Sequence, residues 1–289
     1  MTETLTFKSF RDISRKLTIV ENDLEGADKI LSSLKVSKTP VIGITGPPGA
    51  GKSTLVSKII DALIKRNKRV AVIAVDPSSP FTSGSLLGDR VRMQEFSSNP
   101  NVYIRSVAAR GALGGLSAKI IEITDVIKSF EFDFIIVETV GVGQSEIEIA
   151  GLADFTLVVL VPESGDEVQS IKAGIMEIAD AFIVNKADRE GADYFARHLQ
   201  SIAGSSQIPV CKTVAITGEG LSEIMDLIEV VAPEHKNKVA LLARKAWKLI
   251  QEKRMKDLSL QQLQQELEAV STYPDFNLYK FAESKLRSS

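Results

Sequence analysis

Short apolar runs alternate with longer segments of helical spacing through the middle of the chain. This alternation predicts strands that are joined by helical crossovers into one parallel sheet. The runs are almost entirely apolar rather than alternating, as expected where helices cover both faces of a sheet. The predicted strands are Val41–Thr45, Val70–Val75, Val102–Val107, Phe134–Glu138, Thr156–Val161, Ala181–Val184 and Val210–Val214.

Both ends of the chain carry helical patterns instead. Helices are expected over Phe7–Glu21 and Glu25–Leu34, and a long helical pattern follows Pro233. A later helix places Leu260, Leu263, Leu267 and Val270 at the spacing of a coiled-coil seam, which would suit packing on the chain's own domain and packing on a second subunit equally. We therefore expect an α/β fold in three parts: a helical extension (1–39), a parallel-sheet domain with helices on both faces (40–232) and a C-terminal helical arm (233–289).

The composition is that of an ordinary globular protein, with 44% hydrophobic and 25% charged residues among 289. Lys and Arg number 35 against 37 Asp and Glu, so the charge balance gives no reason to expect binding to nucleic acid or to an anionic membrane. The sequence shows no signal-peptide pattern and no apolar run approaching the ~20 residues of a membrane span, and we expect a cytoplasmic protein. One cysteine and two histidines disfavour a Cys/His metal site.

The most specific motif fits G-x-x-x-x-G-K-[ST] and lies between a predicted strand and a predicted helix. Glycines allow backbone N–H groups to surround phosphates, and the helix N-terminus faces their negative charge. Lys52 would reach the β- and γ-phosphate oxygens, and the Ser53 hydroxyl would bind Mg²⁺. The candidate phosphate-binding residues are Gly46, Pro47, Pro48, Gly49, Ala50, Gly51, Lys52, Ser53 and Thr54.

A second motif, Asn185-Lys186-Ala187-Asp188, directly follows a predicted strand. The Asp188 carboxylate can accept hydrogen bonds from N1–H and the exocyclic amine of guanine, whereas adenine presents an acceptor at N1 and no amine at that carbon. Ligands of open α/β sheets bind at the carboxyl ends of the strands, so this position predicts selection of GTP.

Acidic residues after other strands are candidates for the metal and for the attacking water. Glu138 ends a strand, and the N–H of Gly141 could contact the γ-phosphate. Asp76 and Asp89 could bind Mg²⁺ through water, could position the attacking water, or could be turn or surface residues. Because no glutamine directly follows Gly141 and Gln144 lies three residues later, we expect slow intrinsic hydrolysis that depends on a partner.

Three longer stretches are unusual: Asp76–Phe81 with Gly84–Met93, then Arg110–Leu116, then Glu138–Glu146. Together they resemble one family, the MeaB/ArgK/MMAA family of P-loop GTPases. By this resemblance Ser53, Asp76, Asp89 and Glu138 match the family's Mg²⁺ and switch residues, and Lys52, Asp76, Asp89 and Glu138 are the expected catalytic residues. The segment 163–172 resembles a third switch, in which Asp166 and Lys172 would couple the nucleotide state to a partner. The backbone of Ala215 would contact guanine.

The resemblance implies a GTPase chaperone that uses GTP or GDP with Mg²⁺. Its expected partner is an adenosylcobalamin-dependent acyl-CoA mutase of the methylmalonyl-CoA type, with the cobalamin adenosyltransferase as a further candidate and a homodimer built on the C-terminal arm. Two alternatives are a nickel-inserting maturation GTPase, which the scarcity of Cys and His disfavours, and a kinase of a transport system for basic amino acids.

Overall fold

The structure is a computed structural model that separates into two compact units, Met1–Lys236 and Asn237–Ser289. The residues that it describes are 7–35, 37–76, 94–108, 119–139, 149, 151–165, 178–203, 208–231, 243, 246–247, 249–251, 253–255, 258–273 and 276–286.

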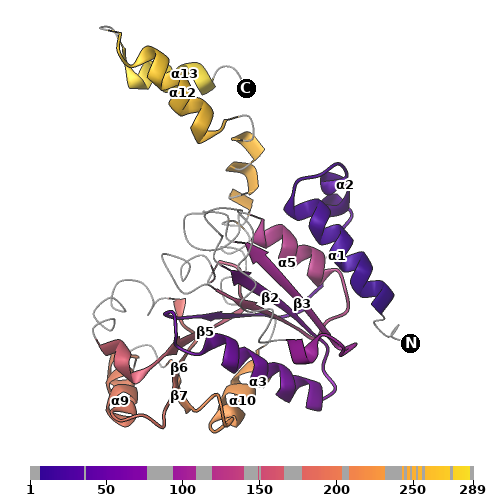
Figure 1. Ribbon diagram of the computed structural model, residues 1–289, viewed down its shortest axis with the longest axis vertical. Helices are drawn as coiled ribbons and strands as arrows, with labels where there is room; N and C mark the ends of the chain where they lie inside the picture. Colours follow the sequence, from indigo (N-terminus) through magenta and orange to yellow (C-terminus); the bar gives the residue numbers. More distant parts are fainter. Residues whose placement is uncertain are drawn as a thin grey trace. The chain divides into compact units, whose positions relative to one another are not determined.

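One seven-stranded sheet forms the centre of the first unit (Figure 1). Its spatial order is β3-β2-β4-β1-β5-β6-β7, and every neighbouring pair is parallel. All carboxyl ends of the strands therefore lie along one edge, and the expected α/β fold is confirmed. The strands are β1 (Val41–Thr45), β2 (Val70–Asp76), β3 (Val102–Ala108), β4 (Phe134–Glu138), β5 (Phe155–Leu160), β6 (Ala181–Asn185) and β7 (Val210–Thr213).

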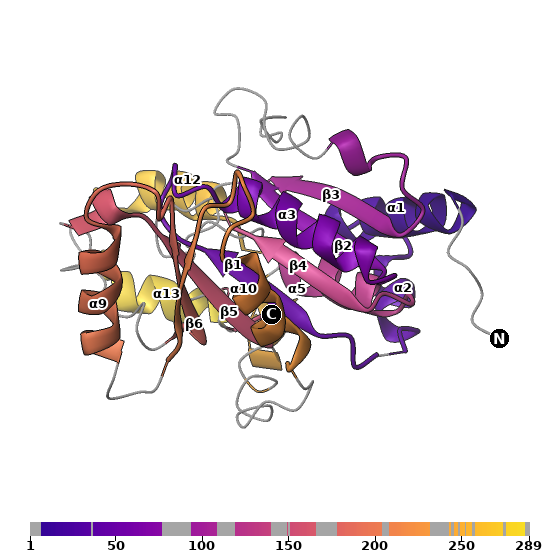
Figure 2. The ribbon, with the colours of Figure 1, turned by 90° about the horizontal axis from the view of Figure 1, so that it is seen from below.

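Helices cover both faces of this sheet (Figure 2). One core contains the buried faces of α3 and α10, and a second contains those of α1 and α5 against the opposite face of β1, β2 and β4. A third core joins α9 to β5 and β6. Besides the strands, the described residues of this unit form α1 (Phe7–Glu21), α2 (Ala27–Ser32), α3 (Lys52–Lys65), η1 (Gln94–Phe96), α5 (Ile120–Lys128), η2 (Pro162–Gly165), α9 (Ala192–Ala203) and α10 (Leu221–Glu229).

The N-terminal helix α1 packs into the sheet unit. Its apolar face, with Ile13, Leu17 and Val20, is buried in the core that also contains α5. Near its C-terminal end, Glu21 accepts a hydrogen bond of 2.7 Å from Arg105 Nη2 on the edge strand β3. Burial and charge pairing thus attach α1 to the same body as the sheet.

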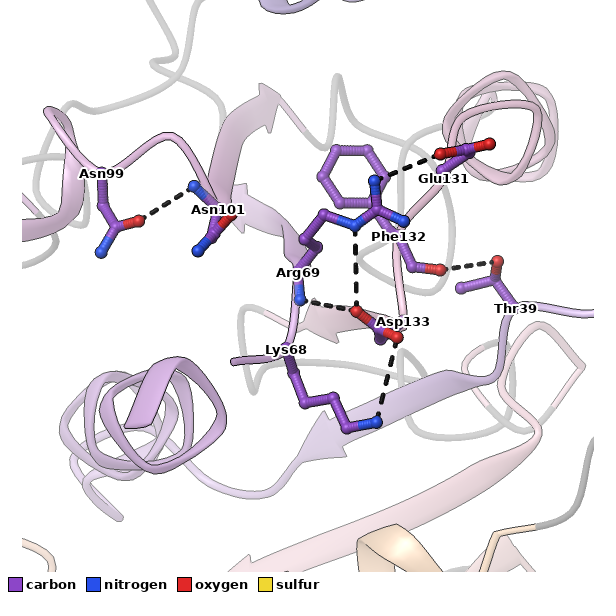
Figure 3. Close-up of polar contacts among 8 residues, drawn as sticks. All are labelled: Thr39, Lys68, Arg69, Asn99, Asn101, Glu131, Phe132 and Asp133. Atoms are coloured by element: carbon purple, nitrogen blue, oxygen red, sulfur yellow. Dashed lines mark hydrogen bonds and ion pairs between the residues drawn. The ribbon is translucent and has the colours of Figure 1, made fainter. Parts of the chain in front are cut away.

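Hydrogen bonds link the segments that precede β1, β2 and β4, at the edge of the sheet where the strands begin (Figure 3). The backbone N–H of Arg69, just before β2, donates to Asp133 Oδ2 at 2.7 Å, just before β4. The Thr39 hydroxyl donates to the carbonyl of Phe132 at 3.1 Å. These contacts fix the segments that enter β1, β2 and β4, at the edge opposite the predicted phosphate-binding loop.

The ends of several elements differ from the expected ones by one or a few residues. The strand expected over Thr156–Val161 is Phe155–Leu160, and the strand expected over Val210–Val214 ends at Thr213. The helix expected over Glu25–Leu34 is Ala27–Ser32; it begins at Ala27 because Gly26 lies in the left-handed region at φ 93°.

The second unit contains α12 (Leu260–Val270) and α13 (Leu278–Leu286). Ser259 and Gln262 form a capping box at the start of α12. Glu266 of α12 pairs with Lys285 of α13. The α12 seam contains no fully buried residue, and Leu260 is 85% exposed. Among the described residues, no helix is both long enough and apolar enough to cross a membrane.

Candidate nucleotide-binding site

The glycine-rich loop follows β1 and leads into α3. Gly46 has φ 137°, and a Cβ there would lie 2.0 Å from the carbonyl oxygen of Val159 on β5. Gly51 has φ 88°, and its Cβ would lie 2.3 Å from Asn185 Nδ2. Both positions therefore require glycine for backbone conformation and for space, which explains the spacing of the motif.

Lys52 is the first residue of α3, and it is 7% exposed. Its ammonium donates to the carbonyl oxygens of Gly46 at 2.8 Å and Pro47 at 3.0 Å. The side chain is thereby held against the loop, with its charge beside the N-terminus of α3. A positive charge and a helix N-terminus at one place favour an anion such as a phosphate group.

Ser53, in the first turn of α3, and Glu138, at the end of β4, meet beside the loop. Glu138 ends β4, which pairs with β1 through Ile44 and Glu138. The Ser53 hydroxyl donates to Glu138 Oε1 at 2.7 Å, and both residues are buried. The next residue, Thr139, donates its backbone N–H to the Ile44 carbonyl and its hydroxyl to Thr45 Oγ1, which fixes the end of β4 against β1.

Asn185, at the end of β6, joins three segments. Its Nδ2 donates to the Ala50 carbonyl at 2.7 Å, and its Oδ1 accepts from the backbone N–H of Ala215 at 3.0 Å. The neighbouring Lys186 donates to the Gly49 carbonyl at 2.7 Å. The Asn185 side chain is buried, so these bonds supply a partner to its amide nitrogen and to its amide oxygen away from water. The phosphate loop, the turn after β6 and the loop after β7 are therefore linked.

A tight turn presents Asp188 at the surface. Lys186 has φ 57°, the Arg189 N–H donates to the Lys186 carbonyl, and the Ala187 N–H donates to the Thr213 carbonyl at the end of β7. Asp188 is exposed between the two cationic residues. Its carboxylate is therefore accessible to a ring that enters from solvent.

The sheet edge brings many of the sequence-predicted residues together, and others lie outside the described residues. The loop 46–54, Glu138, Asn185, Lys186, Asp188 and Ala215 lie at or beside the carboxyl ends of β1, β4, β6 and β7. Asp76 ends β2 at the same edge, opposite Ala108 of β3, and only its backbone is described. Asp89, Gly141, Gln144, Asp166 and Lys172 lie outside the described part of the chain.

Sequence reasoning missed one contact beside the site. Arg189 Nη1 donates to Glu163 Oε1 of η2, the segment that follows β5. This hydrogen bond, first among several causes, lowers the pKa of Glu163 below its ordinary value. Arg189 directly follows the Asn-Lys-x-Asp motif, but a charge pair between two separate loops has no local pattern that would reveal it.

The family model described as "Methylmalonyl Co-A mutase-associated GTPase MeaB" matches residues 13–272, which is most of the chain. The chain belongs to the MeaB family. It is a P-loop GTPase, in agreement with the motif, the parallel sheet and the loop geometry.

Similar proteins carry related names. A putative GTPase of Pyrococcus abyssi is 48% identical over 230 residues, which cover 76% of this chain and 71% of that protein. A Mus musculus protein named "Methylmalonic aciduria type A homolog, mitochondrial" is 40% identical over 196 residues, covering 64% of this chain and 47% of that protein. The solved structure of a LAO/AO transport system kinase superimposes with a TM-score of 0.62 at 25% identity, and the alignment covers 100% of this MeaB-family chain and 97% of that one.

Proposed function

We propose that this MeaB-family GTPase is a chaperone that gates the loading of adenosylcobalamin into an acyl-CoA mutase of the methylmalonyl-CoA type and protects that mutase. The family match carries the proposal, because its description names association with methylmalonyl-CoA mutase. The name of the mouse relative refers to the same metabolism. A cobalamin adenosyltransferase is the second partner that we propose, and the cytoplasm is the proposed location.

Nucleotide selection is assigned to the turn after β6. The exposed Asp188 carboxylate accepts from N1–H and the exocyclic amine of guanine, and the backbone of Ala215 lies at the neighbouring loop. Asn185 holds the phosphate loop through Ala50 and the loop after β7 through Ala215. An adenine ring would leave the carboxylate facing an acceptor, which disfavours ATP.

The residues beside the loop fit a magnesium ion. A hydroxyl and a carboxylate whose oxygens lie 2.7 Å apart, Ser53 Oγ and Glu138 Oε1, are hard oxygen ligands of the kind that Mg²⁺ prefers. Ser53 would hold the ion directly and Glu138 through water, with Asp76 and Asp89 as further ligands. When bound, the ion would neutralise charge on the β- and γ-phosphates.

Hydrolysis in this proposal depends on positioning. Lys52, beside the α3 N-terminus, stabilises negative charge on the phosphate oxygens, and the Gly141 N–H contacts the γ-phosphate. Asp76 or Asp89 positions the attacking water. Gln144, Asp166 and Lys172 link the nucleotide state to the mutase, so the intrinsic rate is slow until the mutase binds.

The C-terminal arm is the proposed dimer contact. In α12, the seam residues Leu263, Leu267 and Val270 are half-buried and Leu260 is exposed. An apolar seam at coiled-coil spacing with this exposure would become buried against a second copy of the chain. Sedimentation equilibrium of the full chain should show a dimer, and Leu263→Glu should shift it to the monomer.

The deciding experiment measures GTP hydrolysis by the full chain with and without a purified adenosylcobalamin-dependent mutase. We expect a low basal rate that rises at least tenfold with the mutase, and cofactor transfer that responds to GTP. A mutase that binds without changing the hydrolysis rate, together with transfer indifferent to GTP, would contradict the proposal.

Two outcomes would instead support the alternative functions. Transfer of labelled γ-phosphate to a transport protein that survives Asp188→Ala would favour a kinase. Tight nickel binding in equilibrium dialysis would favour a maturation GTPase.

A further inference from the structure

An ion pair links the loop after β5 to the turn that carries Asp188. β5 and β6 are neighbouring parallel strands, paired through Leu160 and Val184, so their following segments emerge side by side at the carboxyl edge. Glu163 belongs to the first segment and Arg189 to the second, and Arg189 Nη1 donates to Glu163 Oε1. Both side chains are about half exposed, at 51% and 49%.

The Glu163 carboxylate lies in the field of the two cationic residues that flank Asp188. The hydrogen bond from Arg189 is the largest cause of its lowered pKa, and the charges of Arg189 and Lys186 lower it further. Lys186 is itself held by the Gly49 carbonyl of the phosphate loop. Each side of the turn therefore has one side-chain anchor, Lys186 toward the phosphate loop and Arg189 toward Glu163.

Asp188 depends on the orientation of this turn. The turn is otherwise fixed by backbone hydrogen bonds, from Arg189 N–H to the Lys186 carbonyl and from Ala187 N–H to the Thr213 carbonyl. A carboxylate that accepts two parallel hydrogen bonds from one ring edge needs its plane aligned with the ring. A rotation of the turn would weaken both bonds while leaving the carboxylate accessible.

We propose that Glu163 is a positioning residue for base recognition: it holds Arg189 and, through it, the turn that presents Asp188 to guanine. The inference rests on the proposed contact of Asp188 with the base. Exposed ion pairs add little to global stability, so the effect of removing this pair falls on nucleotide selection rather than on folding.

The test compares GDP with inosine diphosphate, whose base lacks the exocyclic amine that Asp188 would bind. Calorimetric titration gives the dissociation constant of each nucleotide for the unmodified chain and for Glu163→Gln. We expect the preference for GDP to fall about three- to tenfold in Glu163→Gln, because GDP loses strength in two bonds to Asp188, whereas inosine diphosphate, which keeps only N1–H, loses strength in one and weakens less. The double variant with Glu163→Arg and Arg189→Glu should recover most of the preference.

A matched control is available on the same side of the unit. Asp193 of α9 pairs with Lys212 of β7 at 2.6 Å, is also exposed, and has its pKa lowered first by the hydrogen bond from Lys212. This pair does not involve the turn, so Asp193→Asn should leave the preference unchanged. Thermal denaturation without nucleotide should give the same midpoint for both single variants and the unmodified chain.

Several results would overturn the inference. If Glu163→Gln weakens the binding of GDP and of inosine diphosphate equally, the ion pair is only a structural contact. If the preference for GDP is unchanged, Glu163 does not position the base-recognition turn. Asp188→Ala examines the underlying base contact separately. If that variant loses the preference while Glu163→Gln keeps it, only the positioning role fails; if Asp188→Ala keeps the preference, the base contact and the positioning role fail together.

Discussion

The Ser53 hydroxyl donates to Glu138 Oε1 at 2.7 Å across 85 residues of chain. The contact joins the start of α3 to the end of β4. α3 follows β1 along the chain, and β4 pairs with β1 in the sheet. Both residues are buried, so the pair is shielded from solvent beside the loop that would hold the phosphates. The contact thus places the two oxygens that we propose for the magnesium site 2.7 Å apart.

Removing the charge of this pair should impair hydrolysis more than binding. In Glu138→Gln the amide keeps the size of the side chain but is a poor substitute for a carboxylate near a metal ion. We expect kcat to fall by about 10²-fold or more, while GDP affinity measured without Mg²⁺ changes only a few-fold. The rate and the affinity can be followed by phosphate release and by calorimetry. Equal loss in both quantities would indicate damage to the loop instead of the chemistry.

The strands and the local motifs were predictable because their signals are contiguous. β1 and β4 match their expected bounds, and α1 matches over Phe7–Glu21, since a fully apolar run or one amphipathic face marks each element. The strand expected over Thr156–Val161 was shifted by one residue, because Phe155 and Val161 are both apolar and do not mark an end. Apolar content thus located the strands more reliably than it located their ends.

Contacts between distant segments were not predictable in the same way. Asn185 bonds to Ala50 across 135 residues and to Ala215 across 30, and no periodicity encodes such a pairing. The motif predicted where Asn185 would lie but not what it would hold. Its role became visible only from the positions of three loops on one sheet edge.

The Asn185 linkage should be costly to break. Asn185→Ala leaves the buried Ala50 carbonyl and Ala215 N–H without this partner, and unsatisfied buried groups cost about 1–3 kcal/mol each. Urea unfolding without nucleotide should show a loss of about 2 kcal/mol or more, together with weaker GDP binding. As a control, Asn22→Ala removes an exposed asparagine that bonds locally to Thr18, and it should change stability by less than about 0.5 kcal/mol.

A further variant, Asn185→Asp, separates the two bonds. The carboxylate can still accept from Ala215 N–H but cannot donate to the Ala50 carbonyl. We expect its stability to lie at or below that of Asn185→Ala, because the carboxylate would face the Ala50 carbonyl. Wild-type stability in Asn185→Asp would show that the bond to Ala50 contributes nothing.

Gly43, in the middle of β1, allows close packing of the segment before β5. A Cβ at this position would lie 2.6 Å from Ile149 Cγ1 and 2.9 Å from Ala153 Cβ. Gly43→Ala should therefore destabilise the protein by about 1–3 kcal/mol through overpacking, measured by urea unfolding. The double variant with Ile149→Ala removes one of the two close contacts. Its loss should be smaller than the sum of the two single losses, whereas simple addition would mean that the contacts do not matter.

Cys211, on β7, should be unreactive in the folded protein. It is 6% exposed, and burial, with a smaller effect from the charge of Glu223, raises the pKa of its thiol to about 11 from an ordinary 9.0. Since the thiolate is the reactive form, a thiol reagent at pH 8 should modify Cys211 only after unfolding.

The raised pKa of Cys211 also makes the stability depend on pH. Because the folded state retains the thiol proton between pH 9.0 and about 11 while the unfolded chain loses it, the free energy of unfolding should fall as the pH rises through that window. Cys211→Ala supplies the control: the part of the decline due to the thiol should disappear in this variant. An identical decline in both proteins, or rapid modification of the native chain at pH 8, would show that Cys211 is not held as a neutral, buried thiol.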